Sequence, residues 1–380
     1  MTTFAMRIKF LFFLLFLPVF LFAQEVPLSG DARISVLTCG IGNEVYSLFG
    51  HTAIRIQDPQ THLDVVYNYG AFDFEAPNFI LRFSKGDLQY FVTAENFDDF
   101  MYQYYYEKRS VYEQELYLSE EQKQQVFETL NETLSSDARY YTYKFIDRNC
   151  TNMAVDLLNG ILGGKVIRKT GNTAVTYRET LYPYFNSHFY EQLGTSIIFG
   201  TKVDQKATLL FLPVELQNSL AVTNYKGAPI ASTGRMLLNY SHQKTPYSLL
   251  NNGWTFLLLL ILIVVINRYT VAMVYFGIIG AIGLFFSVAG FYSYHEELAW
   301  NYNALLFNPA LLLLIWFYLR RNAKWTYYTA VFCIATIGIY LLVMIGKIHI
   351  FIVAPVVMAN LILLGRFALK AKSGFERIKA

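Results

Sequence analysis

Residues 46–69 read YSLFGHTAIRIQDPQTHLDVVYNY, and this stretch decides the fold of the N-terminal half of the chain. From His51 onward apolar and polar side chains alternate, as they do in a half-buried strand. The turn at residues 58–61 (DPQT) follows, and Leu63–Tyr69 is a second strand-like run. The stretch predicts an antiparallel hairpin whose first strand starts at His51, directly after Gly50, a small residue that lets another element approach closely.

Strand and helix signals are mixed around the hairpin. The predicted elements are strands at residues 33–38, 110–118 and 140–146, and helices at residues 95–108, 119–134 and 151–159. The helix that starts after Ser119 has a capping box, because Gln122 stands three residues later. Gly160 is expected to end the last of these helices. Since no βαβ rhythm appears, the predicted class of this half is α+β.

The N-terminus carries an export signal. Arg7 and Lys9 precede an apolar run over residues 10–22, which ends at the small residue Ala23. This pattern predicts a cleaved signal peptide at residues 1–23, and the alternative is an uncleaved N-terminal anchor. We therefore expect residues 24–250 to form one exported globular domain.

From Trp254 onward charged residues nearly vanish, so residues 251–380 are predicted to form a membrane domain. The five expected spans are residues 254–266, 271–293, 304–319, 326–346 and 349–365. If the N-terminal domain is exported, nine basic residues flank these spans on the side of the C-terminal tail, and only Lys347 lies on the other side. The positive-inside rule then places the C-terminus in the cytoplasm. The net charge of +3 and the lack of a basic patch interleaved with aromatic residues argue against a nucleic-acid partner.

Cys150 stands at the predicted start of the helix at residues 151–159. The free N–H groups and the dipole of a helix start favour a thiolate there, and with Asn149 they can stabilise an oxyanion. Of the four histidines in residues 24–250, His51 is the best placed to act as the base.

The hairpin also suggests a third member of the site. If the turn centres near Pro59-Gln60, residues paired across the two strands sum to about 119, which puts Asn68 opposite His51. An amide there can orient the imidazole, as in cysteine–histidine–asparagine sites. A register shifted by two leaves Asp64 and Tyr67 as alternatives.

A structural disulfide is the other interpretation of Cys150. Cys39 is the only other cysteine in the expected exported domain, and an oxidising compartment permits their pairing. Neither a His-x-x-x-His nor a Cys-x-x-Cys motif occurs, so no metal site and no cofactor are predicted.

Several blocks of the sequence resemble the Lnb family. They are YSLFGHTAIR at residues 46–55, NYGAFDF at 68–74, DRNCT at 147–151, TYRE at 176–179, FLP at 211–213, HEELAWNYN at 295–303 and NP at 308–309. The resemblance covers nearly the whole chain after residue 23. It departs from the family at Arg148-Asn149, where an Asp-Asn pair is more usual before the cysteine.

The resemblance implies a circularly permuted NlpC-type, papain-like domain in the periplasm, followed by a membrane domain in the bacterial inner membrane. It also implies a lipoprotein N-acyltransferase that adds the third acyl chain to the N-terminal cysteine of diacylated lipoproteins. A membrane phospholipid would donate that chain. Carried over by motif, Cys150 is the nucleophile and His51 the base.

Four further residues are predicted to contact substrate: Tyr46, Arg178, His295 and Asn301. The loop at residues 292–303 also fits a simple solvated connection with Trp300 as an interfacial anchor, and Arg178 also fits a surface ion pair. Two other functions stay open: a membrane-anchored cysteine peptidase or amidase acting on cell-wall peptides, and a non-enzymatic scaffold with a Cys39–Cys150 disulfide.

Overall fold

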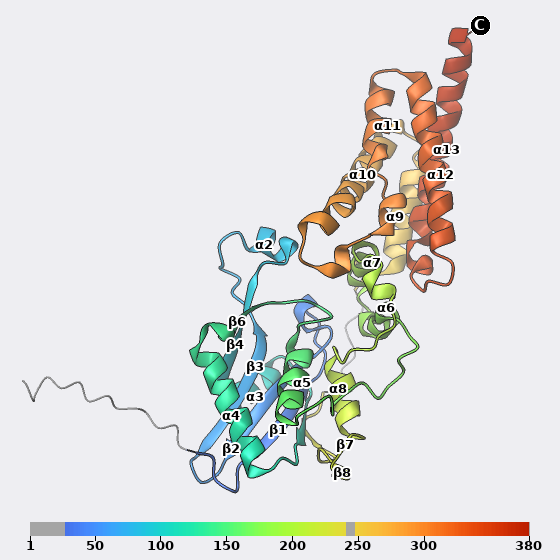
Figure 1. Cartoon of the computed structure of the whole chain (residues 1–380). Coiled ribbons are helices and arrows are strands. Elements are labelled where there is room, and N and C mark those ends of the chain that lie inside the picture. Colours follow the sequence, from blue (N-terminus) through green and yellow to red (C-terminus); the bar gives the residue numbers. More distant parts are fainter. Residues whose placement is uncertain (1–26, 241–247, 380) are drawn as a thin grey trace, which may run out of the picture.

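The computed structural model describes residues 27–240 and 248–379. The predicted signal peptide at residues 1–23 therefore lies outside the described residues. Figure 1 shows an N-terminal domain of strands and helices and, stacked on one end of it, a helical C-terminal part. The first helix of that C-terminal part begins at Gly253.

The N-terminal domain is built on a seven-stranded sheet with the order β6-β4-β3-β2-β1-β5-β9. Its strands are β1 (Arg33–Cys39), β2 (His51–Asp58), β3 (Leu63–Ala71), β4 (Gln89–Asn96), β5 (Val111–Glu115), β6 (Tyr140–Thr142) and β9 (Arg235–Leu238). Every neighbouring pair is antiparallel, and β2 and β3 form the predicted hairpin. Two short strands, β7 (Asn224–Tyr225) and β8 (Ala228–Pro229), pair separately.

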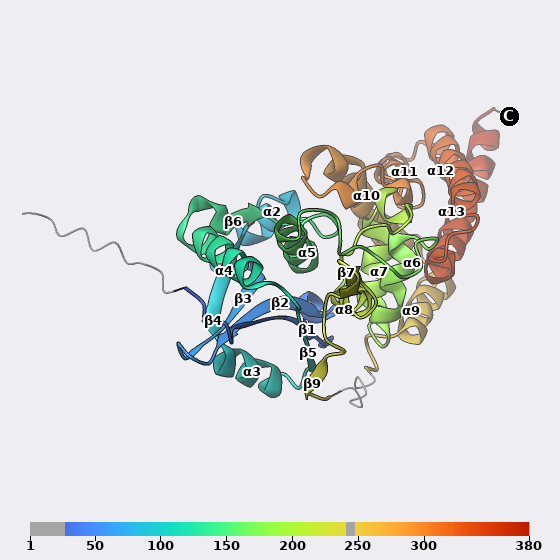
Figure 2. The same cartoon turned by 60° about the horizontal axis from the view of Figure 1, so that its bottom comes forward.

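Helices cover both faces of the sheet. The helices of the N-terminal domain are α2 (Phe79–Lys85), α3 (Phe97–Tyr106), α4 (Glu120–Ser135), α5 (Cys150–Ile161), α6 (Tyr177–Leu181), α7 (Phe189–Ile198) and α8 (Pro213–Leu220), with short 3-10 turns η1 (Val45–Ser47), η2 (Asp137–Arg139), η3 (Tyr182–Phe185) and η4 (Lys202–Asp204). Figure 2 shows α3 on one face and α4 and α5 on the other. The alternating side chains of the strands accordingly split into two cores, and the larger one lies under α4 and α5. The α+β class is confirmed.

The elements around Cys150 and His51 differ from the prediction in three details. The β2–β3 register pairs Ala53 with Asn68, a sum of 121, so His51 lies diagonal to Asn68. The strand expected at residues 140–146 ends at Thr142, because the chain then turns back on itself through a bridge between Lys144 and Arg148. Helix α5 starts at Cys150 and includes Gly160 in its last turn.

The C-terminal part contains five longer helices. They are α9 (Gly253–Val265), α10 (Tyr269–Tyr292), α11 (Ala310–Leu319), α12 (Ala323–Val343) and α13 (Ile350–Lys379), with the 3-10 turns η5 (Glu296–Leu298) and η6 (Tyr302–Leu305) before α11. Among the described residues, α10, α12 and α13 are long and apolar enough to cross a membrane, and η5–η6 with α11 can form a fourth, bent span. At 13 residues, α9 reaches about 20 Å, which is short of a 30 Å hydrocarbon core. Of the five predicted spans, three are therefore matched by full-length helices.

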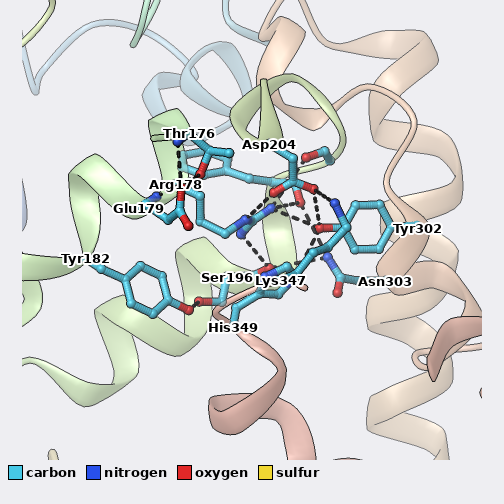
Figure 3. A network of polar contacts seen from close by, with 12 residues as sticks. Thr176, Arg178, Glu179, Tyr182, Ser196, Asp204, Tyr302, Asn303, Lys347 and His349 are labelled. Atoms are coloured by element: carbon cyan, nitrogen blue, oxygen red, sulfur yellow. Dashed lines mark hydrogen bonds and ion pairs between the residues drawn. The ribbon is translucent and has the colours of Figure 1, made fainter. Parts of the chain in front are cut away.

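A buried polar network joins the two parts (Figure 3). Arg178 on α6 is 3% exposed, and its guanidinium donates to Asp204 Oδ1 at 2.6 Å and to the carbonyl of Ser196 at 3.1 Å. From the C-terminal part, the Tyr302 hydroxyl and the Lys347 ammonium each donate to Asp204 Oδ2 at 2.6 Å. The Asp204 carboxylate thus forms ion pairs with cationic side chains from both parts of the chain.

The η5 turn adds a second set of contacts between the parts. Glu297 is 1% exposed and accepts the backbone N–H of Ile146 at 3.1 Å. Its neighbour Glu296 forms ion pairs with Lys144 at 2.6 Å and with Lys202 at 2.7 Å. These contacts lie just before α5, so the C-terminal part directly supports the segment that leads to Cys150.

The network predicts a large effect of Asp204→Asn on stability. The substitution leaves Arg178 buried without its charged partner, which typically costs about 3 kcal/mol or more. We expect the unfolding midpoint of the full chain in detergent to fall by several degrees, whereas Asp137→Asn, at an exposed carboxylate, leaves it unchanged. Equal midpoints for Asp204→Asn and wild type would contradict this role.

Candidate active site

The first turn of α5 is fixed by Asn149, its N-cap residue. Asn149 Oδ1 accepts the backbone N–H groups of Thr151 and Asn152 at 2.9 and 3.2 Å. Its Nδ2 donates to the carbonyls of Phe145 and Phe211, both at 2.8 Å. The predicted role of Asn149 as an oxyanion donor is therefore wrong for its side chain, because both amide hydrogens already have acceptors.

The start of β2 lies against this helix start. Gly50 has a φ of +80°, and a Cβ there would lie 2.5 Å from the carbonyl oxygen of Cys39, so only glycine fits. The Thr52 and Thr151 hydroxyls are 3.0 Å apart in a fully buried contact. This contact holds the start of β2 beside the first turn of α5 and brings His51 to Cys150.

Cys150 and His51 form a hydrogen-bonded pair that favours charge separation. Burial alone raises the pKa of the Cys150 thiol, but the charge and hydrogen bond of His51, the Thr52 N–H and the Thr151 hydroxyl together bring the pKa below its ordinary value. Burial likewise opposes protonation of His51, yet the facing sulfur and Asn68 raise the pKa of the imidazole. Both shifts favour a thiolate–imidazolium pair.

A chain of hydrogen bonds orients the imidazole. His51 Nε2 lies 3.0 Å from Asn68 Oδ1, and Asn68 Nδ2 donates to Glu95 Oε1 at 2.8 Å. Because the Asn68 amide nitrogen faces the Glu95 carboxylate, the Asn68 amide oxygen accepts the Nε2 proton of His51. Nδ1 is then the ring nitrogen that faces Cys150. Asn68 occupies the predicted orienting position, and the alternative Asp64 instead pairs with Arg55 at 2.6 Å.

Cys39 takes no part in a disulfide. Cys39 and Cys150 are both free cysteines. Cys39 is fully buried in the core that contains Phe100 and Tyr104, and this burial raises the pKa of its thiol to about 12. The disulfide interpretation of Cys150 is therefore contradicted.

Two tyrosines lie near the sulfur. Tyr141 is 3% exposed, and its hydroxyl is buried without a hydrogen-bond partner. Burial, and then the charge of Cys150, raises the pKa of both Tyr141 and Tyr143. Arg148, the residue that departs from the family pattern, lies over the Tyr141 ring at 5.3 Å. A buried, unpaired hydroxyl beside a nucleophile is a free hydrogen-bond donor.

Three of the predicted substrate-contacting residues instead join the two parts of the chain. Arg178 belongs to the buried network described above. His295 Nε2 lies 2.9 Å from the carbonyl oxygen of Phe83 on α2, and Asn301 Nδ2 donates to the carbonyls of Ile197 and Ile198 at 2.8 Å. The structure therefore assigns these polar side chains to internal contacts.

Tyr46 lies on η1 and is 61% exposed, so its side chain is open to solvent near the His51 strand. Among residues 27–240 and 248–379, no group of three or more His, Cys, Asp or Glu side chains has the arrangement of a metal site.

Glu95, Thr52 and Tyr141 were not predicted from the sequence. A β3–β4 register would have indicated Glu95, because that pairing puts Val66 opposite Glu95 and Asn68 opposite Thr93. The side chains of Asn68 and Glu95 then share one face of the sheet. No local pattern marks Tyr141, whose role depends on what surrounds its hydroxyl.

The Cys150–His51 pair predicts an unusual pH dependence of alkylation. Because the pKa of Cys150 is lowered, its thiolate persists below the ordinary thiol range, and it is lost only as the pH falls through that lowered pKa. We expect iodoacetamide to label Cys150 at pH 7 more than about tenfold faster than a free thiol, with His51→Ala moving the profile to higher pH. Peptide mass spectrometry measures the labelling of Cys150, and buried Cys39 should stay unlabelled in the same sample. An ordinary profile at Cys150, insensitive to His51→Ala, would contradict the pair.

Comparison with known proteins identifies the domain that holds these residues. Residues 28–182 match the family model of the Lnb N-terminal periplasmic domain, and that range contains His51, Asn68, Glu95 and Cys150. No curated protein and no solved structure matches the chain. The helical part with candidate membrane spans fits a membrane protein with a periplasmic N-terminal domain. The match over residues 28–182 supports membership of the Lnb family.

Proposed function

We propose that this protein is a lipoprotein N-acyltransferase that works through a Cys150 thioester. It would move an acyl chain from a membrane phospholipid to the α-amine of the diacylglyceryl-cysteine of a bacterial lipoprotein. The observation that carries the proposal is the hydrogen-bonded Cys150–His51 pair, with both pKa shifts towards thiolate and imidazolium. Membership of the Lnb family supports lipoprotein maturation as the process.

We assign the periplasmic domain to a circularly permuted, papain-like arrangement of the NlpC type. The supporting observations are the order of the parts and their packing. A histidine strand, β2, precedes the cysteine helix, α5, and α5 packs against β2 and β3 of an antiparallel sheet. The Asn68 amide takes the orienting position of the third member.

In the first half-reaction the Cys150 thiolate attacks the carbonyl carbon of a phospholipid ester. A C–S bond forms and the ester C–O bond breaks. The imidazolium of His51 gives its proton to the leaving alkoxide, which departs as a lysophospholipid alcohol. The products at the site are an acyl-thioester on Cys150 and a neutral His51.

In the second half-reaction the neutral α-amine of the lipoprotein cysteine attacks the thioester carbonyl. A C–N bond forms, the C–S bond breaks, and His51 takes the proton of the amine. Cys150 returns to thiolate and His51 to imidazolium, so the pair is regenerated. Because the amide product is more stable than the thioester, this step pulls the reaction forward.

Each half-reaction develops negative charge on a carbonyl oxygen that needs hydrogen-bond donors. We assign this role to the buried Tyr141 hydroxyl and to the backbone N–H of Cys150. In the first turn of α5, Asn149 caps Thr151 and Asn152 and leaves the Cys150 N–H uncapped. The lone hydroxyl of Tyr141 requires no bond to be broken before it donates.

We further propose that the C-terminal part crosses the inner membrane with its C-terminal tail in the cytoplasm. The nine-to-one distribution of basic residues supports this orientation. Five crossings need α9 and the bent η5–η6–α11 segment in addition to α10, α12 and α13. Both lipid substrates would then lie in the leaflet beside the periplasmic domain.

The first test is mass spectrometry of lipoproteins in a bacterial strain that lacks its own N-acyltransferase. Expression of the wild-type protein should restore triacylation, Cys150→Ser should abolish it, and His51→Ala should lower the rate by about 10² or more. Cys39→Ala, at the buried cysteine, is the matched control and should retain activity. Lipoproteins that stay diacylated with wild-type protein would contradict the function, and cleavage of cell-wall peptides instead would favour the peptidase alternative.

The oxyanion assignment predicts that Tyr141→Phe lowers kcat by about 10² and changes KM little, because the lost hydrogen bond acts only in the transition state. Tyr140→Phe, at the exposed neighbour, is the control. The rate of Cys150 alkylation should be the same in both variants. An unchanged kcat in Tyr141→Phe would remove this hydroxyl from the mechanism.

A further inference from the structure

Aromatic side chains form a continuous row from the neighbourhood of Cys150 to the C-terminal part. Consecutive ring centroids are separated by 4.5 Å (Tyr143–Tyr90), 5.2 Å (Tyr90–Phe72), 6.0 Å (Phe72–Phe79), 6.1 Å (Phe79–Phe83) and 6.1 Å (Phe83–His295). At its inner end, Cys150 and Tyr143 pack on the same core cluster, which contains Tyr90. We call residues 143, 90, 72, 79 and 83 the aromatic row.

The outer end of the aromatic row is helix α2, and the other described residues leave most of its large apolar side chains exposed. None of its seven residues is buried, and Ile80, Leu81 and Phe83 are 76%, 66% and 49% exposed. Phe74, which packs on Phe72 and Phe79, is 65% exposed. A short helix that presents adjacent large apolar side chains to water is typical of a surface with a partner.

Helix α2 is fastened to the periplasmic end of the C-terminal part. The Tyr294 N–H donates to the carbonyl of Lys85 at 2.7 Å, and the Ser293 hydroxyl donates to that of Ser84 at 3.0 Å. These residues follow directly after α10, one of the candidate membrane spans. Figure 1 shows α2 at the end of the periplasmic domain that faces the C-terminal helices. The exposed face of α2 therefore lies beside the expected edge of the bilayer.

The residues around α2 have the chemistry of a membrane interface. The Lys85 ammonium lies 6.0 and 5.4 Å from the Tyr292 and Tyr294 rings, and both rings are more than half exposed. Trp300 in the same loop is 79% exposed. Exposed aromatic rings with a basic residue, continuous with a membrane span, favour lipid over a second protein as the partner of this surface.

We propose that α2 inserts its apolar face into the outer surface of the bilayer, and that the aromatic row guides an acyl chain of a membrane phospholipid from there to Cys150. The guiding role of the aromatic row rests on the acyl transfer proposed above, whereas the insertion of α2 does not. In this arrangement Ile80 and Leu81 contact lipid. The rings behind them give the extracted chain an apolar surface in place of water.

Photocrosslinking tests the lipid contact without any turnover. Full-length Cys150→Ser protein is reconstituted in phosphatidylethanolamine–phosphatidylglycerol vesicles that contain a phospholipid with a diazirine in one acyl chain. Peptide mapping should find the lipid adduct on residues 79–83 and not on the exposed Tyr102 and Tyr105 of α3, on the far face of the sheet. Labelling of α2 no stronger than that of α3 would overturn the proposal, as would a protein bound to α2 in its place.

The double variant Ile80→Asp/Leu81→Asp tests the function of this contact. Transfer from vesicle phospholipid should fall at least about tenfold, because two buried aliphatic contacts with lipid are lost. The alkylation rate of Cys150 and its acylation by a water-soluble short-chain ester should stay at wild-type values. Tyr102→Asp/Tyr105→Asp is the matched control and should behave as wild type.

Undiminished transfer from vesicles by Ile80→Asp/Leu81→Asp would overturn the guiding role. If wild-type protein transfers no acyl chain from any donor, the proposed enzyme function fails instead. The crosslinking pattern in the Cys150→Ser protein still decides whether α2 contacts lipid, so the two failures are distinguishable.

Discussion

Asn149 uses both atoms of its side-chain amide to fix the point at which α5 begins. Two backbone N–H groups of the helix bind its oxygen, and two carbonyls from Phe145 and Phe211 accept its hydrogens. A helix that started one residue later would turn the next side chain by about 100°. With the Thr52–Thr151 contact, this cap keeps the Cys150 sulfur against His51, and the proposed chemistry of the domain depends on that placement.

Local patterns were enough to predict the parts of the fold and of the site that a single segment defines. The alternation after His51, the capping box at Ser119 and the cysteine at a helix start each depend on neighbours within a few residues. The register was wrong by two because Asp58 pairs with Leu63, so that the turn at residues 59–62 is centred one residue later than expected. Asn68 still reaches His51, since a long side chain can contact the diagonal neighbour across two strands.

Three polar residues that were predicted to contact substrate have internal partners in the structure, for a physical reason. Arg178, His295 and Asn301 have partners that lie at least 18 positions away along the chain and, for the last two, more than 100. A single sequence does not distinguish a polar side chain that binds substrate from one that binds a distant carbonyl. The same limit applies to Glu95 and Tyr141, whose positions depend on strand pairing and on burial. Tertiary contacts, not local propensity, decide such roles.

The two parts of the chain are more tightly joined than a tether requires. Asp204 binds cations from both parts, and η5 contacts the segment that leads into α5. The C-terminal part thus holds the periplasmic domain in a fixed orientation, with α2 beside the end of α10. In the proposed reaction Cys150 carries the acyl group, and intact-protein mass spectrometry detects such a thioester. Incubated with phospholipid and no amine acceptor, the wild-type protein should gain the mass of one acyl chain on Cys150, removable by hydroxylamine; a wild-type protein of unchanged mass that still acylates lipoproteins would contradict the account.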